Sequence, residues 1–254
     1  MSRLPLLIAL VLAVFLHPVT AWPEQDKPSL AEAKAAYKEA DRALNAAYES
    51  AKAELAEHDF EDLKTKQRSW IRYRDDFTND SLRWNDPALA GADLTQVVAY
   101  WQRMERITRE RTGILRSIVG SELGKDFPLT GRWIDGFGGY LDIVEQDGQE
   151  AAFEINVTRG TTHHSGQIAG LAKANGRILR YSDGGEDDGK GYVRKPAWVT
   201  LIRRHDHIEL ISVNAQHYCG ARAYFDSDYY RVGDLTEEDR KRVLESAAGD
   251  AAAP

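Results

Sequence analysis

The hydrophobic pattern of this chain changes its period once, and this change limits the possible folds more than any other feature of the sequence. Up to about residue 120, large apolar residues recur at helical spacing, with Leu63, Trp70 and Phe77 at intervals of seven. From Gly131 onward, apolar and polar residues alternate, as in residues 153–158, which is typical of half-buried strands. The sequence therefore predicts an α+β fold in which helices precede strands.

The first half of the chain predicts three helices. The first begins at Ser29, because the Ser29 hydroxyl and the Glu32 carboxylate can form a capping box. Asp59 follows its end and is expected to cap a second helix over residues 60–84. Asp93 is expected to start the third.

Short connections favour antiparallel neighbours. We therefore predict an antiparallel three-helix domain over residues 22–120, in which the stripe that contains Trp70 packs against the preceding helix. The charged residues of the third helix are most simply its solvated face; they are Arg103, Glu105, Arg106, Arg109 and Glu110.

The second half predicts about eight short strands over residues 129–232. Turn signals separate them at Asp147-Gly148, Asn175-Gly176 and Asp183-Gly184-Gly185. An antiparallel barrel or sandwich is the natural arrangement, because closure removes exposed sheet edges. The large residues expected to point inward are Trp133, Phe153, Trp198 and Phe225. Residues 233–254 are expected to form a short helix from Thr236, capped with Asp239, and then a disordered tail from residue 247.

The N-terminus predicts export from the cytoplasm. Arg3 precedes the apolar run Leu4–Leu16, and the small residues Val19-Thr20-Ala21 resemble a signal-peptidase site. Residues 1–21 are therefore expected to be a signal peptide that is cut after Ala21, which gives a periplasmic or secreted protein that does not span the membrane once processed. An uncleaved membrane anchor is the alternative, although the run is short for a bilayer span.

The charge and the reactive side chains exclude several classes of function. The formal net charge of -7 disfavours a nucleic-acid partner and suits a basic protein. The single cysteine, Cys219, cannot form an internal disulfide, and we expect it to be buried at the start of a strand. His205 and His207 would share one face of a strand and His163-His164 would lie at a turn, without the further ligands that zinc requires. No metal, cofactor or catalytic residue is therefore predicted.

Two segments of the predicted helices resemble a known family. The segments Asp41-x-x-Leu44-Asn45-x-x-Tyr48 and Leu63-x-x-x-Gln67-x-x-Trp70-Ile71-x-Tyr73-Arg74-Asp75 are similar to the N-terminal domain of the LprI-type lysozyme inhibitors. The resemblance implies a non-catalytic protein that binds lysozyme or another muramidase. The binding residues that it implies are Asp41, Asn45, Tyr48, Gln67, Trp70, Tyr73, Arg74 and Asp75.

The resemblance extends weakly to the second half and departs from the family in its cysteines. Gly131-Arg132-Trp133, residues 164–170 and Cys219-Gly220 resemble a small β-domain that accompanies LprI-type helices in some secreted proteins. The family pattern implies cysteines near Glu32 and Thr78, and another near Ala197 to pair with Cys219, but this chain has none there.

The polar residues beside Trp70 have two interpretations. Asp41, Asn45, Gln67, Arg74 and Asp75 could form a recognition surface or an interior polar network between the first two helices. The network is favoured because side chains on the stripe of Trp70 should face inward, where each charge needs a partner.

The most acidic stretch of the chain also has two interpretations. Asp183, Glu186, Asp187 and Asp188 lie among glycines in a segment that is either a solvated loop or an acidic finger that contacts a basic partner.

Three functions remain open at this point. The first is an exported binding protein that occludes the cleft of a muramidase. The second is a periplasmic module in which the barrel holds a small apolar ligand, or the helices dock to another envelope component, without lysozyme inhibition. The third is an enzyme that acts on cell-wall polymers, for which an open groove lined by two carboxylates would be the structural sign. The oligomeric state is not indicated.

Overall fold

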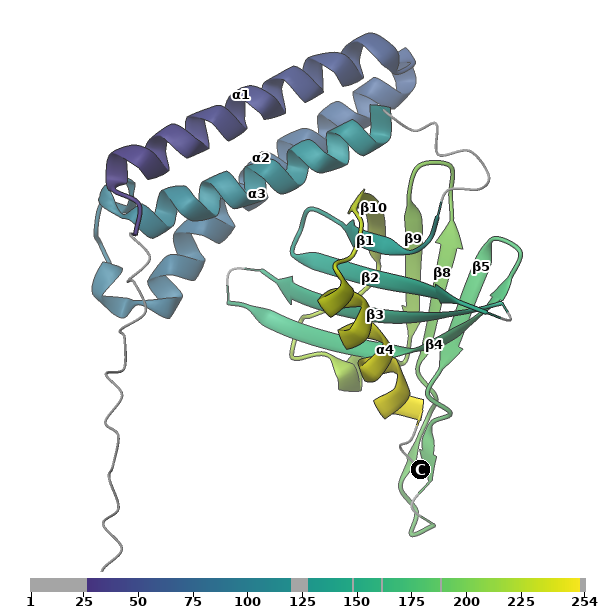
Figure 1. Cartoon of the computed structure of the whole chain (residues 1–254). Coiled ribbons are helices and arrows are strands. Elements are labelled where there is room, and N and C mark those ends of the chain that lie inside the picture. The colour runs from purple at the N-terminus through teal and green to yellow at the C-terminus, as the bar shows by residue number, and fades with distance from the viewer. Residues whose placement is uncertain (1–26, 120–127, 148, 161, 188, 252–254) are drawn as a thin grey trace, which may run out of the picture.

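The computed structural model describes residues 27–119, 128–147, 149–160, 162–187 and 189–251. The predicted signal peptide and its cleavage point lie outside these residues. In the described part, three long helices are followed by a closed antiparallel β-barrel and a final helix, as Figure 1 shows. The predicted order of helices and strands is thereby confirmed. None of the described helices combines the length and apolar character that a membrane span requires.

The helix α1 covers Leu30–Glu54 and starts with the predicted capping box. The Glu32 backbone N–H donates to the Ser29 hydroxyl over 3.2 Å, and the Ser29 N–H donates to the Glu32 carboxylate over 2.7 Å. The two orphan N–H groups are thus satisfied locally, which is why the sequence alone located this helix start.

The starts of the next two helices differ from the prediction. The helix α2 covers Glu57–Asn85 and follows Ala56, which supplies no side-chain cap, so Asp59 lies inside the first turn. Two 3-10 turns follow, η1 (Pro87–Leu89) and η2 (Leu94–Gln96), before α3 begins at Val98 and runs to Val119. The Asp93 carboxylate accepts the Thr95 N–H over 3.0 Å and therefore caps η2 instead of α3.

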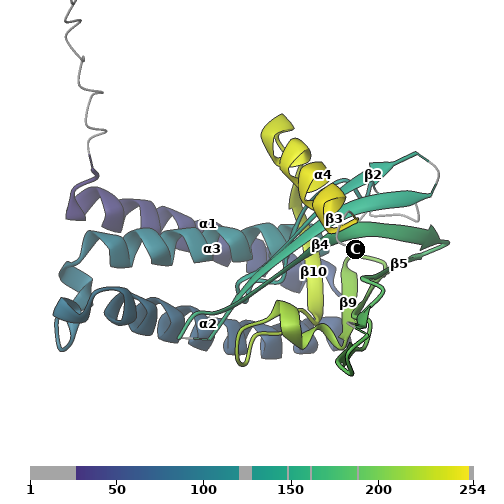
Figure 2. The same ribbon diagram turned by 90° about the horizontal axis from the view of Figure 1, so that it is seen from below.

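Small side chains bring α1 closest to α3. Figures 1 and 2 show α1 beside α3 in the same direction, with α2 running the opposite way. The buried stripe of α1 consists of Ala33, Ala40, Leu44, Ala47 and Ala51. The predicted stripe of Leu63, Trp70 and Phe77 on α2 is buried in a cluster that includes residues from both α1 and α3.

The barrel consists of eight strands that pair in chain order. They are β1 (Gly131–Ile134), β2 (Gly139–Gln146), β3 (Glu150–Arg159), β4 (His164–Asn175), β5 (Ile178–Ser182), β8 (Trp198–Arg203), β9 (Ile208–Val213) and β10 (Ser227–Gly233). The last strand, β10, pairs with β1 and closes the barrel, so no strand of the barrel has a free edge. A separate hairpin of β6 (Glu186–Asp187) and β7 (Val193–Arg194) is inserted between β5 and β8, and η3 (Ala215–Tyr218) precedes β10.

Large side chains fill the barrel interior. Trp133, Phe153, Phe225 and Tyr229 are fully buried in its core. Trp198, which was expected to point inward, is 46% exposed, because Val199 and Leu201 take the inward positions of β8 and alternation turns Trp198 outward.

The helix α4 (Glu237–Ala251) lies against the outside of β2, β3 and β4 (Figure 1). The predicted Thr236–Asp239 cap is present, with the Asp239 N–H donating to the Thr236 hydroxyl over 3.1 Å. The helix continues to Ala251, so the tail expected to be disordered from residue 247 is helical to that point. Ala247 is buried with Val243 and Leu235 against the barrel, which explains why the helix extends.

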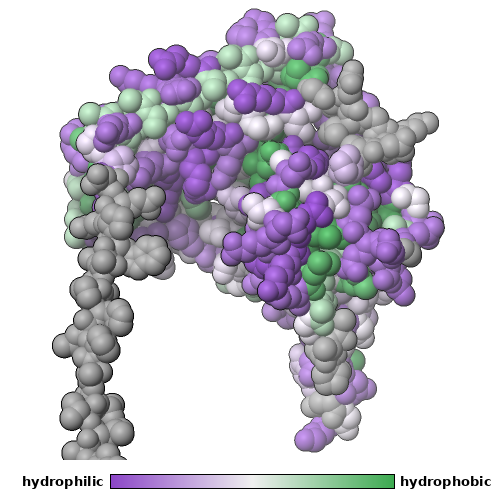
Figure 3. All heavy atoms as spheres, in the orientation of Figure 1, coloured by the Kyte–Doolittle hydropathy of each residue, from purple (hydrophilic) through white to green (hydrophobic). Residues whose placement is uncertain are grey.

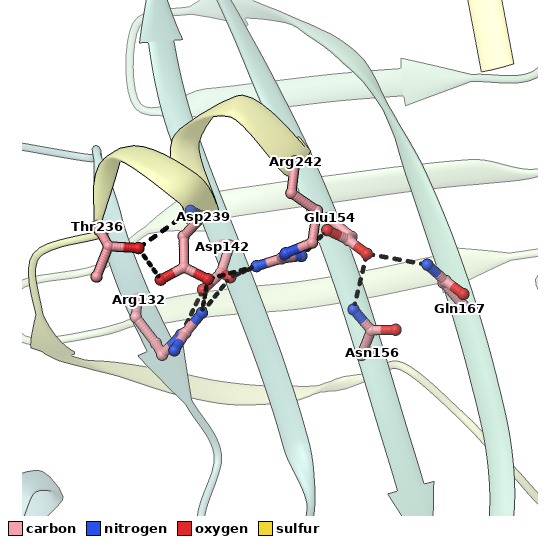
Figure 4. Close-up of polar contacts among 8 residues, drawn as sticks. All are labelled: Arg132, Asp142, Glu154, Asn156, Gln167, Thr236, Asp239 and Arg242. Carbon is pink, nitrogen blue, oxygen red and sulfur yellow. Dashed lines mark hydrogen bonds and ion pairs between the residues drawn. The ribbon is translucent and has the colours of Figure 1, made fainter. Parts of the chain in front are cut away.

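An ionic network attaches α4 to the barrel, as Figure 4 shows. Asp142 on β2 and Glu154 on β3 are register partners on the outer face, where two carboxylates alone would repel each other. Arg242 of α4 pairs with both, and its Nη2 lies 2.7 Å from Asp142 Oδ2. Arg132 of β1 lies 2.8 Å from Asp142 and 2.9 Å from Asp239. The network thus depends on three strands and the helix together.

The helices dock on the end of the barrel that carries the β1–β2 turn. Ile114 of α3 is buried with Ile134 and Tyr230 of the barrel. The Tyr140 hydroxyl donates to Glu110 over 2.7 Å and accepts from Arg106 over 3.1 Å. The prediction that these charged residues of α3 form a solvated face is therefore wrong for Glu110, whose side chain is only 22% exposed beside the barrel, while Arg106 remains 50% exposed.

A buried ion pair lies at the same end of the barrel. Arg159, at the end of β3, donates to Asp135 Oδ2 over 2.5 Å, and both side chains are almost completely buried. Asp135 Oδ1 accepts the N–H groups of Phe137 and Gly139, each over 2.8 Å. Burial would lower the pKa of Arg159, but the Asp135 charge outweighs it and raises that pKa. The pair holds the β1–β2 turn in the shape on which the helices dock.

Candidate functional site

A groove of about 420 Å³ runs between α1 and α2 and brings together most of the residues implied by the resemblance. Asp41, Asn45 and Tyr48 contribute from α1, and Gln67 and Arg74 contribute from α2. The groove is completed by Leu44, Lys64, Arg68 and Ile71. Helical spacing places these residues on facing sides of two antiparallel helices.

Two residues that line this groove, Gln67 and Arg74, also belong to a group of polar side chains around Trp70. Trp70 is fully buried, and the guanidinium carbons of Arg74 and Arg111 lie 5.2 and 5.7 Å from its ring centroid. Arg111 Nε donates to Gln67 Oε1 over 2.7 Å, and Arg74 Nε donates to Asp75 over 2.9 Å. Both arginines gain cation–π contacts that compensate in part for burial. The predicted network between the first two helices is therefore not found among the described residues: Asp41 and Asn45 contact each other on α1, and Gln67 pairs with Arg111 of α3 instead.

The outer rim of the groove is formed by side chains that remain accessible. Asn45 Nδ2 donates to Asp41 Oδ2 over 3.3 Å along the exposed face of α1. Ile71 lies among these polar side chains and is 41% exposed. The groove thus offers an apolar centre with polar groups around it, the arrangement typical of protein-binding surfaces.

Tyr73 does not line this groove. Its ring lies on the barrel side of α2, 5.3 Å from the ring of Phe77 and 5.2 Å from that of Phe137. Burial raises its pKa, so the hydroxyl stays protonated. Of the residues implied by the resemblance, Trp70, Tyr73 and Asp75 therefore do not line the α1–α2 groove.

Residues 23–115 match the family described as Lysozyme inhibitor LprI. The match covers α1, α2 and most of α3, and thus the whole α1–α2 groove. No curated protein matches the chain, and no solved structure matches it. The barrel and α4 lie outside the LprI match.

The acidic segment that was predicted as a possible contact contains both exposed and buried carboxylates. Figure 1 shows β6 and β7 projecting from the barrel. Glu186 and Asp187 are exposed on it, while Asp188 lies outside the described residues. The Asp183 side chain is only 4% exposed and pairs with Arg194, so the prediction that it is a contact residue is not supported by its position.

Asp183 instead anchors the hairpin. It accepts the N–H groups of Gly185 over 2.9 Å and Ala197 over 2.8 Å, and the Tyr218 hydroxyl donates to it over 3.1 Å. Burial alone would raise the pKa of Asp183, but these hydrogen bonds and that of Arg194 lower it to about 2. The carboxylate thereby joins the segment at Ala197 to η3, close to where the family resemblance implies a disulfide.

A second groove, of about 450 Å³, lies where the LprI helices meet the barrel. It is lined by Glu54, Asp59, Asp62 and Asp206 together with His205 and His207. This is an open groove with several carboxylates, the sign that was expected of a cell-wall enzyme. Burial alone would raise the pKa of Asp206, but the hydrogen bond of 2.7 Å from His207 outweighs it and lowers that pKa, the opposite of what a general acid requires.

The histidines and the cysteine lie in different surroundings from those predicted. His205 and His207 lie in the turn between β8 and β9 instead of on a strand, and His207 Nε2 lies 3.5 Å from Asp228. Cys219 follows η3 and is half-buried, and burial raises the pKa of its thiol. Its backbone pairs with that of Gly166 in an isolated antiparallel β-bridge. No group of three or more metal-ligating side chains is found among the described residues.

Sequence reasoning missed Arg111, although a signal was present. Arg111 lies on the same stripe of α3 as Ile107 and Leu115, four residues from each. A charged residue on an apolar stripe indicates a buried partner, and Gln67 was available on the neighbouring helix.

Proposed function

We propose that this protein is an exported, non-catalytic binding protein that inhibits a lysozyme or related muramidase by occluding its cleft. The observation that carries this proposal is the LprI match over the helices that form the α1–α2 groove. Export is supported by the signal-peptide pattern that ends at Ala21.

The α1–α2 groove is the proposed contact surface. Ile71 supplies an exposed apolar centre, and Asp41 and Asn45 supply a polar rim on α1. Small apolar groups surrounded by polar residues contribute most of the affinity of many interfaces. On the face drawn in Figure 3, hydrophilic residues predominate and apolar ones are visible only in small groups.

Charge favours encounter with a basic muramidase. The net charge is -7. The exposed Glu186 and Asp187 of the hairpin contribute to it, as do the carboxylates of the second groove, where the helices meet the barrel. Such charges mainly increase the association rate. We propose the hairpin as a secondary contact that accelerates binding.

The packed barrel favours this function over that of a carrier of small apolar ligands. An eight-stranded barrel is either filled by its own side chains or holds one small molecule. Trp133, Phe153, Phe225 and Tyr229 occupy its core. The barrel would therefore serve as a support for the helices and the hairpin.

The test is a muramidase assay with the mature chain from Trp22. We expect stoichiometric loss of cell-wall lysis and no turnover of peptidoglycan by the protein alone. Ile71→Asp should weaken inhibition by about tenfold or more, because it places a charge in the apolar centre of the contact. Ile211→Asp is the matched control, since Ile211 is similarly exposed, at 40%, but lies on β9.

Two results would contradict the proposal. Undiminished lysis at a large excess of the folded protein would refute inhibition. Equal loss of inhibition in the Ile71 and Ile211 variants would refute the groove as the contact surface, while leaving inhibition itself in place.

A further inference from the structure

A cleft of about 340 Å³ lies between the helices and the end of the barrel, beside the contact of Tyr140 with Glu110. Figures 1 and 2 both show the connected ends of β3 and β4 reaching toward α2. Tyr73, Phe77 and Ile107 form the apolar part of the lining. Arg103, Arg106 and His163 supply its cationic and imidazole groups. The α2 residues that line this cleft, Tyr73 and Phe77, are not among those that line the α1–α2 groove.

Two buried nitrogen atoms at this cleft lack hydrogen-bond partners among the described residues. They are Nη1 of Arg103 and Nε2 of His163. Both groups pack on the same ring, since the Arg103 guanidinium carbon lies 5.8 Å and the His163 ring 5.3 Å from the centroid of Phe77. Buried polar atoms normally have a partner, so each unpaired one requires an explanation.

The cationic charge at the cleft is not balanced. Arg106 pairs with Glu110 over 2.7 Å, which leaves the charge of Arg103 without a carboxylate partner among the described residues. Burial and the nearby Arg106 lower the pKa of Arg103, and burial and Arg103 lower the pKa of His163. An anion between Arg103 and His163 would relieve this repulsion and satisfy both nitrogen atoms.

The backbone around the cleft is held in shape before any ligand binds. His163 has a φ of 54°, a left-handed conformation that is uncommon for a residue with a side chain. A Cβ on Gly138 would lie 2.2 Å from the carbonyl oxygen of Thr158, so the β1–β2 turn approaches β3 too closely for any other residue at this position. Strained and tightly packed backbone of this kind often occurs at ligand sites.

We propose that this cleft binds a singly charged carboxylate attached to a ring-sized body. Arg103, Arg106 and Glu110 together leave one positive charge, which matches one carboxylate better than a doubly charged phosphate monoester. The carboxylate would lie between Arg103 and His163, and the ring would lie against Phe77, Tyr73 and Ile107. The volume is at the lower end of the range of about 300–1,000 Å³ that small-molecule sites occupy, which suits one ring.

The chemistry fits both an aromatic acid and a sugar acid, and paired probes separate them. Isothermal titration of the mature chain would compare benzoate with its neutral analogue benzamide, and N-acetylmuramic acid with N-acetylglucosamine, which lacks the carboxylate. At least one acid should bind saturably with a Kd below about 1 mM, and its neutral counterpart should not.

Substitutions locate the site. Arg103→Gln should weaken binding by about tenfold or more, because it removes a charge-assisted hydrogen bond. Arg109→Gln, on the exposed face of the same helix where Arg109 pairs with Glu105, should have no effect. His163→Ala provides a second test if Arg103→Gln does not fold.

Several results would overturn the proposal. They are the absence of saturable binding by either acid, equal binding of an acid and its neutral analogue, and unchanged binding in the folded Arg103 or His163 variant. None of these results depends on muramidase inhibition, so this inference and the proposed function can fail separately.

Discussion

At the scale of single residues, several charged side chains are buried and contact segments that are distant in the sequence. Arg159 and Asp135 form an almost completely buried pair, and Arg111 is buried against Trp70. A buried charge is tolerated only with a partner, so each of these residues fixes the position of another segment. Their substitution should therefore have large and specific effects.

Arg159→Leu should destabilise the protein by about 3–5 kcal/mol, because it leaves the Asp135 carboxylate buried without its cation. Urea unfolding followed by tryptophan fluorescence would measure the loss. The double variant with Asp135→Asn should recover part of it, since Asn can still accept the N–H groups of Phe137 and Gly139. A single-variant loss below about 1 kcal/mol would contradict the burial of this pair.

The pKa of His163 should rise when Arg103 is replaced. Burial is the main cause that lowers this pKa, and the Arg103 charge is the second. Arg103→Gln removes the second cause, so the pKa should rise but stay below its ordinary value. NMR titration of the His163 imidazole measures this pKa, and Arg109→Gln is the control. An unchanged pKa in Arg103→Gln would show that Arg103 and His163 do not interact.

At the scale of elements, the last helix and the acidic hairpin are each attached by a small set of ionic contacts. The helix α4 depends on Arg242, which pairs with Asp142 and Glu154 (Figure 4). The β6–β7 hairpin depends on Asp183. Each element should therefore loosen separately from the barrel when its anchor is removed.

Arg242→Ala should detach α4 selectively. It leaves the carboxylates of Asp142 and Glu154 partly unpaired, at a cost of about 1–3 kcal/mol. Hydrogen exchange should accelerate in α4 while β2 and β3 stay protected. Lys241→Ala is the control, because Lys241 forms an exposed pair with Glu245 over 3.7 Å. Equal exchange in both variants would refute the role of Arg242.

Because the Asp183 carboxylate holds the hairpin, the stability of the protein should depend on pH. Its pKa is about 2 in the folded protein and near 3.8 when unperturbed. A lowered pKa means that the stabilisation is fully present above about pH 4 and is lost as the pH falls through about 2. Asp183→Asn should therefore reduce the stability of the protein at pH 7. It should also make the loss of stability between about pH 4 and about pH 2 smaller than in the wild type, as measured by thermal unfolding. An equal loss of stability in both proteins over this range would contradict the prediction.

At the scale of the whole molecule, the helices and the barrel form a joint surface. Lys66 of α2 lies 3.4 Å from Asp228 of β10, and Tyr140 of β2 contacts α3. Residues of α2 help to line the α1–α2 groove, the second groove at the helix–barrel junction, and the cleft that contains Arg103 and His163. A partner could thus contact helical and barrel residues together.

Binding of a basic muramidase should weaken as salt increases. An increase of sodium chloride from about 20 mM to about 500 mM screens the attraction between the acidic chain and its partner, and we expect roughly a tenfold increase in Kd. Interferometry with immobilised muramidase measures the change, and most of it should appear in the association rate. A salt-independent association rate would show that net charge has no part in the encounter.

The sequence by itself determined the elements whose causes are local. The Ser29–Glu32 box and the Thr236–Asp239 cap are contacts between residues three apart, and the stripe of Leu63, Trp70 and Phe77 repeats within one helix. The alternation of apolar and polar residues after Gly131 predicted the strands, because it too is a pattern among neighbouring residues. Trp198 also obeys the alternation: Val199 points inward, so its neighbour Trp198 points outward.

Only the tertiary structure decided which charged groups face inward. Asp183 meets Tyr218, Arg103 packs on Phe77, and His163 reaches that same ring across the cleft. These partners are brought together by closure of the barrel and by its docking on the helices. Periodicity describes one element at a time, so contacts between distant elements, which fix the sites of this protein, are not contained in it.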